Sequence, residues 1–183
     1  MTEQPKNFGF GEDETMLRDS ARKFFADNCG ADKIHRQVAD DPTIHRPIEC
    51  LWDKDLWQQI VELGWTAVFI PESVGGVGMS IVAAVSIAEE VGKVAFPSPL
   101  ISTYCATSVL IACASEAANS ALSDIVTGTP TTLAITNRQG SWNASDTDVT
   151  VSDGKLQGTA WFVQDAMKAD SFVVSAKGPN GVG

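Results

Sequence analysis

The spacing of apolar residues changes once along this chain. Up to about residue 128, apolar residues recur every three or four positions, which is typical of helices that bury one face. From residue 131 onward, apolar and polar residues alternate in short runs, which is typical of strands. The pattern predicts an α+β, multi-domain chain: an all-α helical bundle over residues 1–128, then the beginning of an antiparallel β-sandwich or barrel over residues 129–183.

Capping and turn residues divide both parts into elements. Gly30 and Gly64 are typical helix stops, and Ser80 is a suitable N-cap. Asp153-Gly154 is a strong hairpin signal. We expect helices over residues 12–28, 53–63, 80–94, 99–114 and 115–127. We expect strands over residues 131–136, around 149–151, and over 155–163 and 172–176.

Charge and hydropathy exclude two classes of partner. The net charge of −10 argues against nucleic acid, because binding phosphates needs clustered Lys and Arg. The uncharged stretch over residues 94–115 contains Pro97, Pro99 and several hydroxyl residues, so it predicts a buried helix rather than a membrane span. The polar, acidic N-terminal sequence is unlike a signal peptide, which makes the cytoplasm the expected location.

Cysteine and histidine spacing gives no metal site. None of the four cysteines forms a C-x-x-C pair, and we expect buried free thiols. Cys105 and Cys113 share a predicted helix that separates them by about 12 Å, too far for a disulfide. His35 and His45 have no cysteine or acidic partner at metal-ligand spacing.

Residues 63–78 read LGWTAVFIPESVGGVG and combine closely spaced glycines with a Pro-Glu pair. From the residues alone, this is a tight connection between two helices, because glycine permits positive φ and Pro71 fixes one torsion. The segment also resembles the first-domain signature of the acyl-CoA dehydrogenase family of flavoenzymes. Ala67 stands where that signature has a glycine.

Two segments of the β part extend the resemblance. Residues 133–136 are similar to the family's strand before its flavin-binding T-E-P-x-x-G-S-D loop, and residues 161–163 are similar to its W-I-[TS] segment. The resemblance implies FAD, with a hydroxyl at the flavin's pyrimidine edge, another at its pyrophosphate and a tryptophan beside the ring. The implied cofactor-binding residues are Ile135, Thr136, Ser141, Trp161, Phe162 and Val163.

The chain also departs from the family pattern. Asn137 and Arg138 replace its Glu-Pro pair, Trp142 its aspartate and Thr159 its lysine. Val163 stands where the family has a hydroxyl residue. From the residues alone, the first segment is a polar loop after a strand, and Trp161 is an aromatic residue in a sheet.

By resemblance, the reaction is α,β-desaturation of an acyl-CoA thioester, in which a glutamate takes the α-proton and FAD accepts a hydride. The family's glutamate lies in a C-terminal helical domain beyond these 183 residues, so we expect no catalytic residue here and no activity from this chain alone. We expect Glu89 and Glu90 to form a solvated stripe with Ser86 and Lys93.

Three interpretations of the chain stay open. It is a piece of a full enzyme, a subunit completed by a partner chain, or a non-catalytic binding or assembly module. The resemblance implies an acyl-CoA substrate, a homo- or hetero-oligomer of related subunits, and an electron-transfer protein as acceptor. Glu89-Glu90 within a helix and the apolar residues 97–100 are similar to a divergent branch of the family. That branch includes bacterial enzymes that act on bulky thioesters, including steroid-derived ones.

Overall fold

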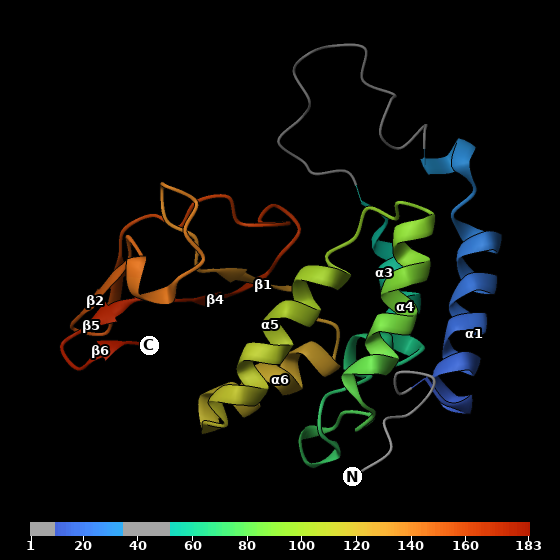
Figure 1. Ribbon diagram of the computed structural model, residues 1–183, viewed down its shortest axis with the longest axis horizontal. Helices are drawn as coiled ribbons and strands as arrows, with labels where there is room; N and C mark the ends of the chain where they lie inside the picture. Colours follow the sequence, from blue (N-terminus) through green and yellow to red (C-terminus); the bar gives the residue numbers. More distant parts are fainter. Residues whose placement is uncertain (1–9, 35–51) are drawn as a thin grey trace, which may run out of the picture.

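A computed structural model describes residues 10–34 and 52–183 of the chain (Figure 1). The sequence predictions about His35 and His45 lie outside the described residues. The five expected helices are confirmed, each to within one residue at both ends. They are α1 Glu12–Asn28, α3 Lys54–Glu62, α4 Ile81–Lys93, α5 Leu100–Cys113 and α6 Glu116–Val126.

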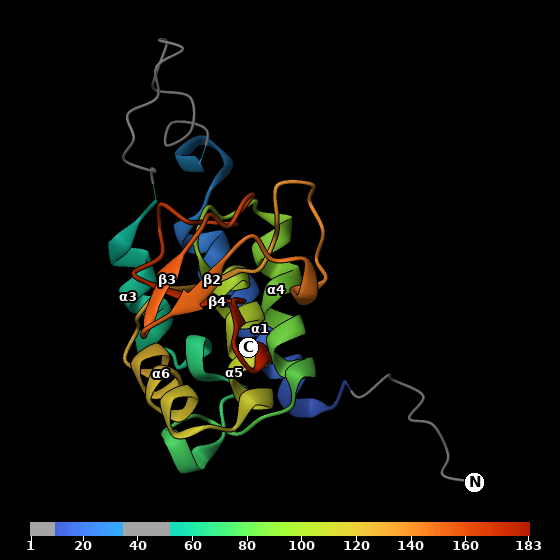
Figure 2. The same cartoon turned by 90° about the vertical axis from the view of Figure 1, so that its left-hand side faces the viewer.

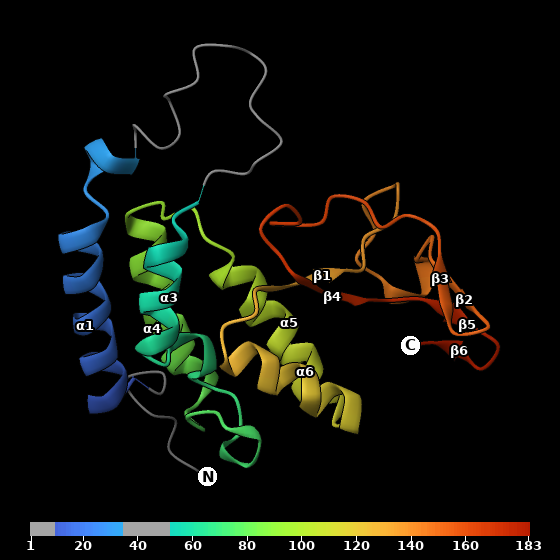
Figure 3. The same cartoon turned by 180° about the vertical axis from the view of Figure 1, so that it is seen from behind.

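An aromatic cluster holds the helical part together. Helices α1 and α4 run side by side (Figures 1 and 3). Ala21 and Phe25 lie one helical turn apart on α1, and both side chains are fully buried. The Phe25 ring lies 5.4 Å from that of Phe96 and 5.8 Å from that of Trp65, measured between ring centroids. The core therefore joins the first helix to residues far along the chain.

The glycine-rich segment folds back on itself as a tight connection between α3 and α4. Backbone N–H groups of Val77 and Gly78 donate to the carbonyls of Ala67 and Ile70, at 3.0 and 2.8 Å. A Cβ added to Gly76 would lie 2.1 Å from the Ile70 carbonyl oxygen. Only glycine therefore fits at this position, and the segment has the structural role that its residues alone predict.

Short strands follow the helices, as the alternation predicts. They are β1 Thr131–Ala134, β2 Thr150–Ser152, β3 Lys155–Gln157, β4 Ser171–Val174, β5 Lys177–Gly178 and β6 Gly181–Val182. In the Asp153-Gly154 hairpin between β2 and β3, both φ values are positive, at 50° and 71°. The expected strand over residues 155–163 is too long: β3 ends at Gln157, because the backbone leaves the extended conformation at Gly158, with φ 135°. Trp161 therefore lies outside the strands and not in a sheet.

The described strands form two small sheets with mixed pairing. β1 pairs with β4 in parallel, and the second sheet has the order β3-β2-β5-β6. Its β2–β3 and β5–β6 pairs are antiparallel, and its β2–β5 pair is parallel. The α+β organisation is confirmed, and these pairings refine the expected antiparallel sheet. β1 starts against α5, where the Thr131 N–H donates to the Thr103 hydroxyl at 3.2 Å. Figure 2 shows β2 and β3 on the side of the molecule that faces the viewer.

Two expectations about burial are wrong. Glu90 and Ser86 are buried on α4, whereas Ile81 and Val85 on the same helix are 57% and 44% exposed. Glu89 and Lys93 are exposed as expected, but the Glu90 carboxylate faces α1, where Arg22 pairs with it. Cys105 and Cys113 on α5 are exposed; Cys29 is buried as expected.

None of the described helices is long and apolar enough to cross a membrane.

Candidate functional site

The loop after β1 is organised by one buried side chain. The Asn137 side-chain oxygen accepts hydrogen bonds from the N–H groups of Gln139 and Ser141, at 3.0 and 2.9 Å. Its amide nitrogen donates to the Asp146 carbonyl at 3.1 Å. Asparagine is suited to such turns because its side chain can hydrogen-bond to backbone a few residues on. The asparagine that replaces the family's glutamate thus fixes the shape of this loop.

The structure brings the two predicted flavin segments together. The backbone N–H of Trp161 donates to the carbonyl of Thr136 at 2.8 Å. The Thr136 side chain is largely buried, and its hydroxyl has no hydrogen-bond partner among the described residues. Trp161 is 38% exposed and Phe162, at φ 52°, is 74% exposed. A free hydroxyl and two accessible aromatic rings therefore lie on adjoining segments.

The other predicted residues are placed less favourably. Ile135 and Val163 adjoin the Thr136–Trp161 contact along the backbone, and both are partly exposed. The Ser141 hydroxyl donates to the Asp146 carboxylate at 2.6 Å. That hydroxyl is already engaged by an acidic group, on its own loop.

A polar cluster anchors the tryptophan-bearing segment to α5. The Asp165 carboxylate accepts a hydrogen bond from the Ser102 hydroxyl at 3.0 Å and pairs with Lys168 at 2.8 Å. The Asp165 and Lys168 side chains are only 13% and 11% exposed. The Thr132 hydroxyl donates to the Gln164 carbonyl at 2.7 Å. Sequence reasoning missed this cluster, whose members come from three separate elements and share no motif.

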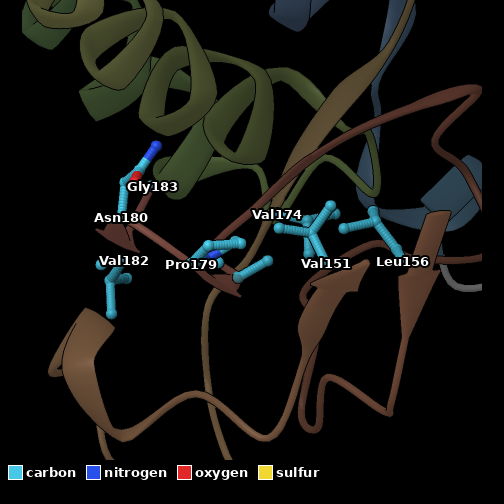
Figure 4. A pocket seen from close by; sticks show the side chains of 10 residues that line it. Val151, Leu156, Val174, Pro179, Asn180, Val182 and Gly183 are labelled. Atoms are coloured by element: carbon cyan, nitrogen blue, oxygen red, sulfur yellow. The ribbon is translucent and has the colours of Figure 1, made fainter. Parts of the chain in front are cut away.

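The structure also has two apolar hollows without acid–base chemistry. One, of about 460 Å³, lies at the β3-β2-β5-β6 sheet, where Val151, Leu156 and Val174 project next to one another (Figure 4). Another, of about 170 Å³, lies between α4 and α5 and is lined by residues such as Phe69 and Val85. Neither is lined by a carboxylate or a histidine.

Two further kinds of chemistry were sought in the described part of the chain: a metal site and a free buried carboxylate. Within residues 10–34 and 52–183, no cluster of His, Cys, Asp and Glu side chains could hold a metal ion. The buried carboxylate of Glu90 is paired with Arg22 and Lys93 in the helical part. The Glu90 carboxylate is therefore already neutralised by two cations and is not a free general base.

The helical part and the short strands after it define the kind of domain, and comparison with known proteins gives its family. The model of the acyl-CoA dehydrogenase N-terminal domain matches residues 11–129. Since that match covers more than half of the chain, the chain belongs to the acyl-CoA dehydrogenase family.

The relatives are about twice as long as this chain. Acyl-CoA dehydrogenase IpdE2 of Mycobacterium tuberculosis is 28% identical over 151 residues, which are 82% of this chain and 45% of that protein. A variant of the Tcur3481-Tcur3483 steroid ACAD superposes with a TM-score of 0.76 at 30% identity, over 94% of this chain and 47% of that one.

A third similarity, to a solved complex, supports the fold alone. The ChsE4-ChsE5 complex from Mycobacterium tuberculosis superposes with a TM-score of 0.75 at 21% identity, over 96% of this chain and 46% of that one. The chain thus spans about half the length of each protein that it matches.

FAD fits one end of this site better than the other. The unpaired Thr136 hydroxyl and the accessible Trp161 suit a planar, hydrogen-bonding ring. At Ser141 the hydroxyl is occupied, and the Asp146 carboxylate would repel a phosphate. The residues present therefore fit the flavin ring, whereas Ser141 and Asp146 themselves offer a pyrophosphate no positive charge.

Proposed function

We propose that this chain is the N-terminal half of an FAD-dependent acyl-CoA dehydrogenase. The hydrogen bond from Trp161 to the Thr136 carbonyl carries the proposal, because it joins the two segments that resemble the family's flavin site. When bound there, FAD supplies hydride acceptance in the α,β-desaturation of an acyl-CoA thioester.

The residues of this chain bind and orient in that reaction. The Thr136 hydroxyl would donate a hydrogen bond to the flavin ring, and Trp161 would pack against the ring and exclude water. Val163 offers only its backbone N–H, since its side chain has no donor. The general base comes from outside this chain, because Glu89 is a surface residue of α4 and Glu90 is held by cations.

We infer a bulky, steroid-type thioester as the substrate, because a structure at 30% identity is named a steroid ACAD. An electron-transfer protein is the proposed acceptor. Residence in the cytoplasm stays a prediction of the polar N-terminal sequence.

A second candidate function is a subunit or assembly module that does not perform the chemistry itself. Val163 and the Ser141–Asp146 hydrogen bond favour it, because both remove a donor expected for flavin. Two of the similar structures are named for pairs of chains, which supports a related partner subunit.

The test is an intact-mass measurement on the freshly purified natural protein, with a visible absorption spectrum of the same sample. A mass well above 19.5 kDa, or a second homologous chain, together with the absorption bands of oxidised flavin supports the dehydrogenase. A colourless assembly would contradict it and favour the module.

A further inference from the structure

Arg138 is the one cationic residue in the segments 135–142 and 158–164. Its guanidinium carbon lies 5.6 Å from the centroid of the Trp161 ring. Its backbone N–H donates to the Asp148 carboxylate at 2.9 Å, which fixes the start of the side chain. The loop thus holds a cation over the face of the tryptophan.

The charge of this guanidinium is not neutralised by an ion pair. Among the described residues, none of the salt bridges involves Arg138, and the nearby Asp148 carboxylate accepts from its backbone instead. Arg138 is itself exposed. A ligand that approaches Trp161 therefore meets an available positive charge.

We propose that Arg138 is an electrostatic residue of the cofactor site, which favours the reduced, anionic flavin ring over the oxidised, neutral one. The inference rests on the proposed FAD site. Uptake of a hydride adds one negative charge to the ring, and a fixed cation nearby stabilises that charge. This site otherwise lacks positive charge, and it also lacks the side-chain donor at Val163. The cation–π contact with Trp161 pre-orients the guanidinium, so less freedom is lost when the ring binds.

The experiment uses the intact assembly that contains this chain, with Arg138→Gln and Arg138→Lys variants. Dissociation constants for FAD are measured by flavin fluorescence and calorimetry, with oxidised FAD and, without oxygen, with dithionite-reduced FAD. Lys155→Gln is the matched control, since it removes an exposed cation from the β2–β3 hairpin.

In Arg138→Gln, we expect the affinity for reduced FAD to fall about 3- to 30-fold, the range of one cation–π contact or nearby charge, and that for oxidised FAD to fall less. Arg138→Lys keeps the charge but not the planar guanidinium, so its loss of affinity should be smaller. Lys155→Gln should bind both forms like the wild type.

Two results would overturn the inference in distinguishable ways. If the assembly binds FAD and Arg138→Gln weakens both forms equally or neither, Arg138 has no electrostatic role, and the proposed function stands. If the wild-type assembly binds no FAD in either form, the proposed function is wrong, and so is the role proposed for Arg138.

Discussion

The guanidinium of Arg22 on α1 lies 3.0 Å from the carboxylate of Glu90 on α4. Lys93, one turn further along α4, reaches the same carboxylate oxygen at 2.7 Å. The Glu90 side chain is 4% exposed, whereas Arg22 and Lys93 are 54% and 55% exposed. The buried carboxylate of Glu90 is thus neutralised by two cations that keep contact with water. The Arg22–Glu90 ion pair links α1 to α4 in the helical bundle.

Replacement of Glu90 by glutamine should destabilise the protein by about 1–3 kcal/mol, the contribution of charge-assisted hydrogen bonds. The lower half of that range is expected, because the two cations regain water when the carboxylate is lost. Urea unfolding of the purified protein measures the change. Glu89→Gln on the exposed side of α4 is the control and should shift the free energy by about 0.5 kcal/mol or less. Equal effects of the two substitutions would contradict the structure.

The contribution of Glu90 should disappear in acid. Burial raises the pKa of Glu90, but hydrogen bonds and positive charge from Arg22 and Lys93 outweigh it, so its net pKa lies below the ordinary 4.5. A depressed folded-state pKa gives stability that is fully present above the unfolded-state pKa and is lost as the pH falls through the folded-state value. The difference in unfolding free energy between wild type and Glu90→Gln should therefore be constant near neutral pH and shrink below about pH 4.5. A difference that grows in acid would reverse the assigned sign.

Gly76→Ala should prevent folding or lower stability by more than about 4 kcal/mol, because backbone atoms of Ile70 occupy the space of the new methyl group. Gly92→Ala is the matched control: it lies on α4 with nothing within 4 Å of an added Cβ. That change should stabilise the helix by up to about 1 kcal/mol. Thermal unfolding of both variants distinguishes the two environments, and a well-folded Gly76→Ala protein would refute the close approach.

Local signals made most of the fold predictable. Helix ends follow from capping and stop residues such as Gly64 and Ser80, and the hairpin follows from Asp153-Gly154. Burial of Glu90 was not predictable, because it depends on Arg22, which is 68 residues away in sequence. A polar stripe on one helix looks the same whether water or another helix faces it.

Prediction of the candidate site from sequence was limited in the same way. The sequence singled out Thr136 and Trp161 by resemblance, and the structure places their backbones in contact. The sequence also shows that Arg138 stands where the family has a proline. A sequence alone, however, does not show where that side chain points. The engagement of Ser141 by Asp146 is likewise a matter of three-dimensional placement.

Asp165→Asn should loosen the segment that carries Trp161. Asparagine tolerates positive φ about as well as aspartate, so the backbone at φ 52° is not the cause. The substitution leaves the mostly buried Lys168 without its charge partner, which costs about 1–3 kcal/mol. Hydrogen exchange at residues 158–170 should accelerate, and Trp161 emission should shift. Asp170→Asn, at an exposed carboxylate, should change neither signal.

Val163→Thr tests whether the missing hydroxyl limits the chemistry. The two side chains have nearly the same shape, so the substitution adds a donor two residues after Trp161 with little change in packing. One new hydrogen bond of about 0.5–1.5 kcal/mol, made mainly as the hydride is transferred, corresponds to about a 2- to 10-fold faster reduction of bound flavin. Stopped-flow absorbance of the FAD-bearing assembly with an acyl-CoA substrate measures this rate. Val151→Thr, at the apolar hollow beside the small sheet, controls for a general effect of an added hydroxyl. A rate that Val163→Thr leaves unchanged would mean that the side chain at this position does not face the reacting part of the ring, and that the backbone N–H is the donor that matters.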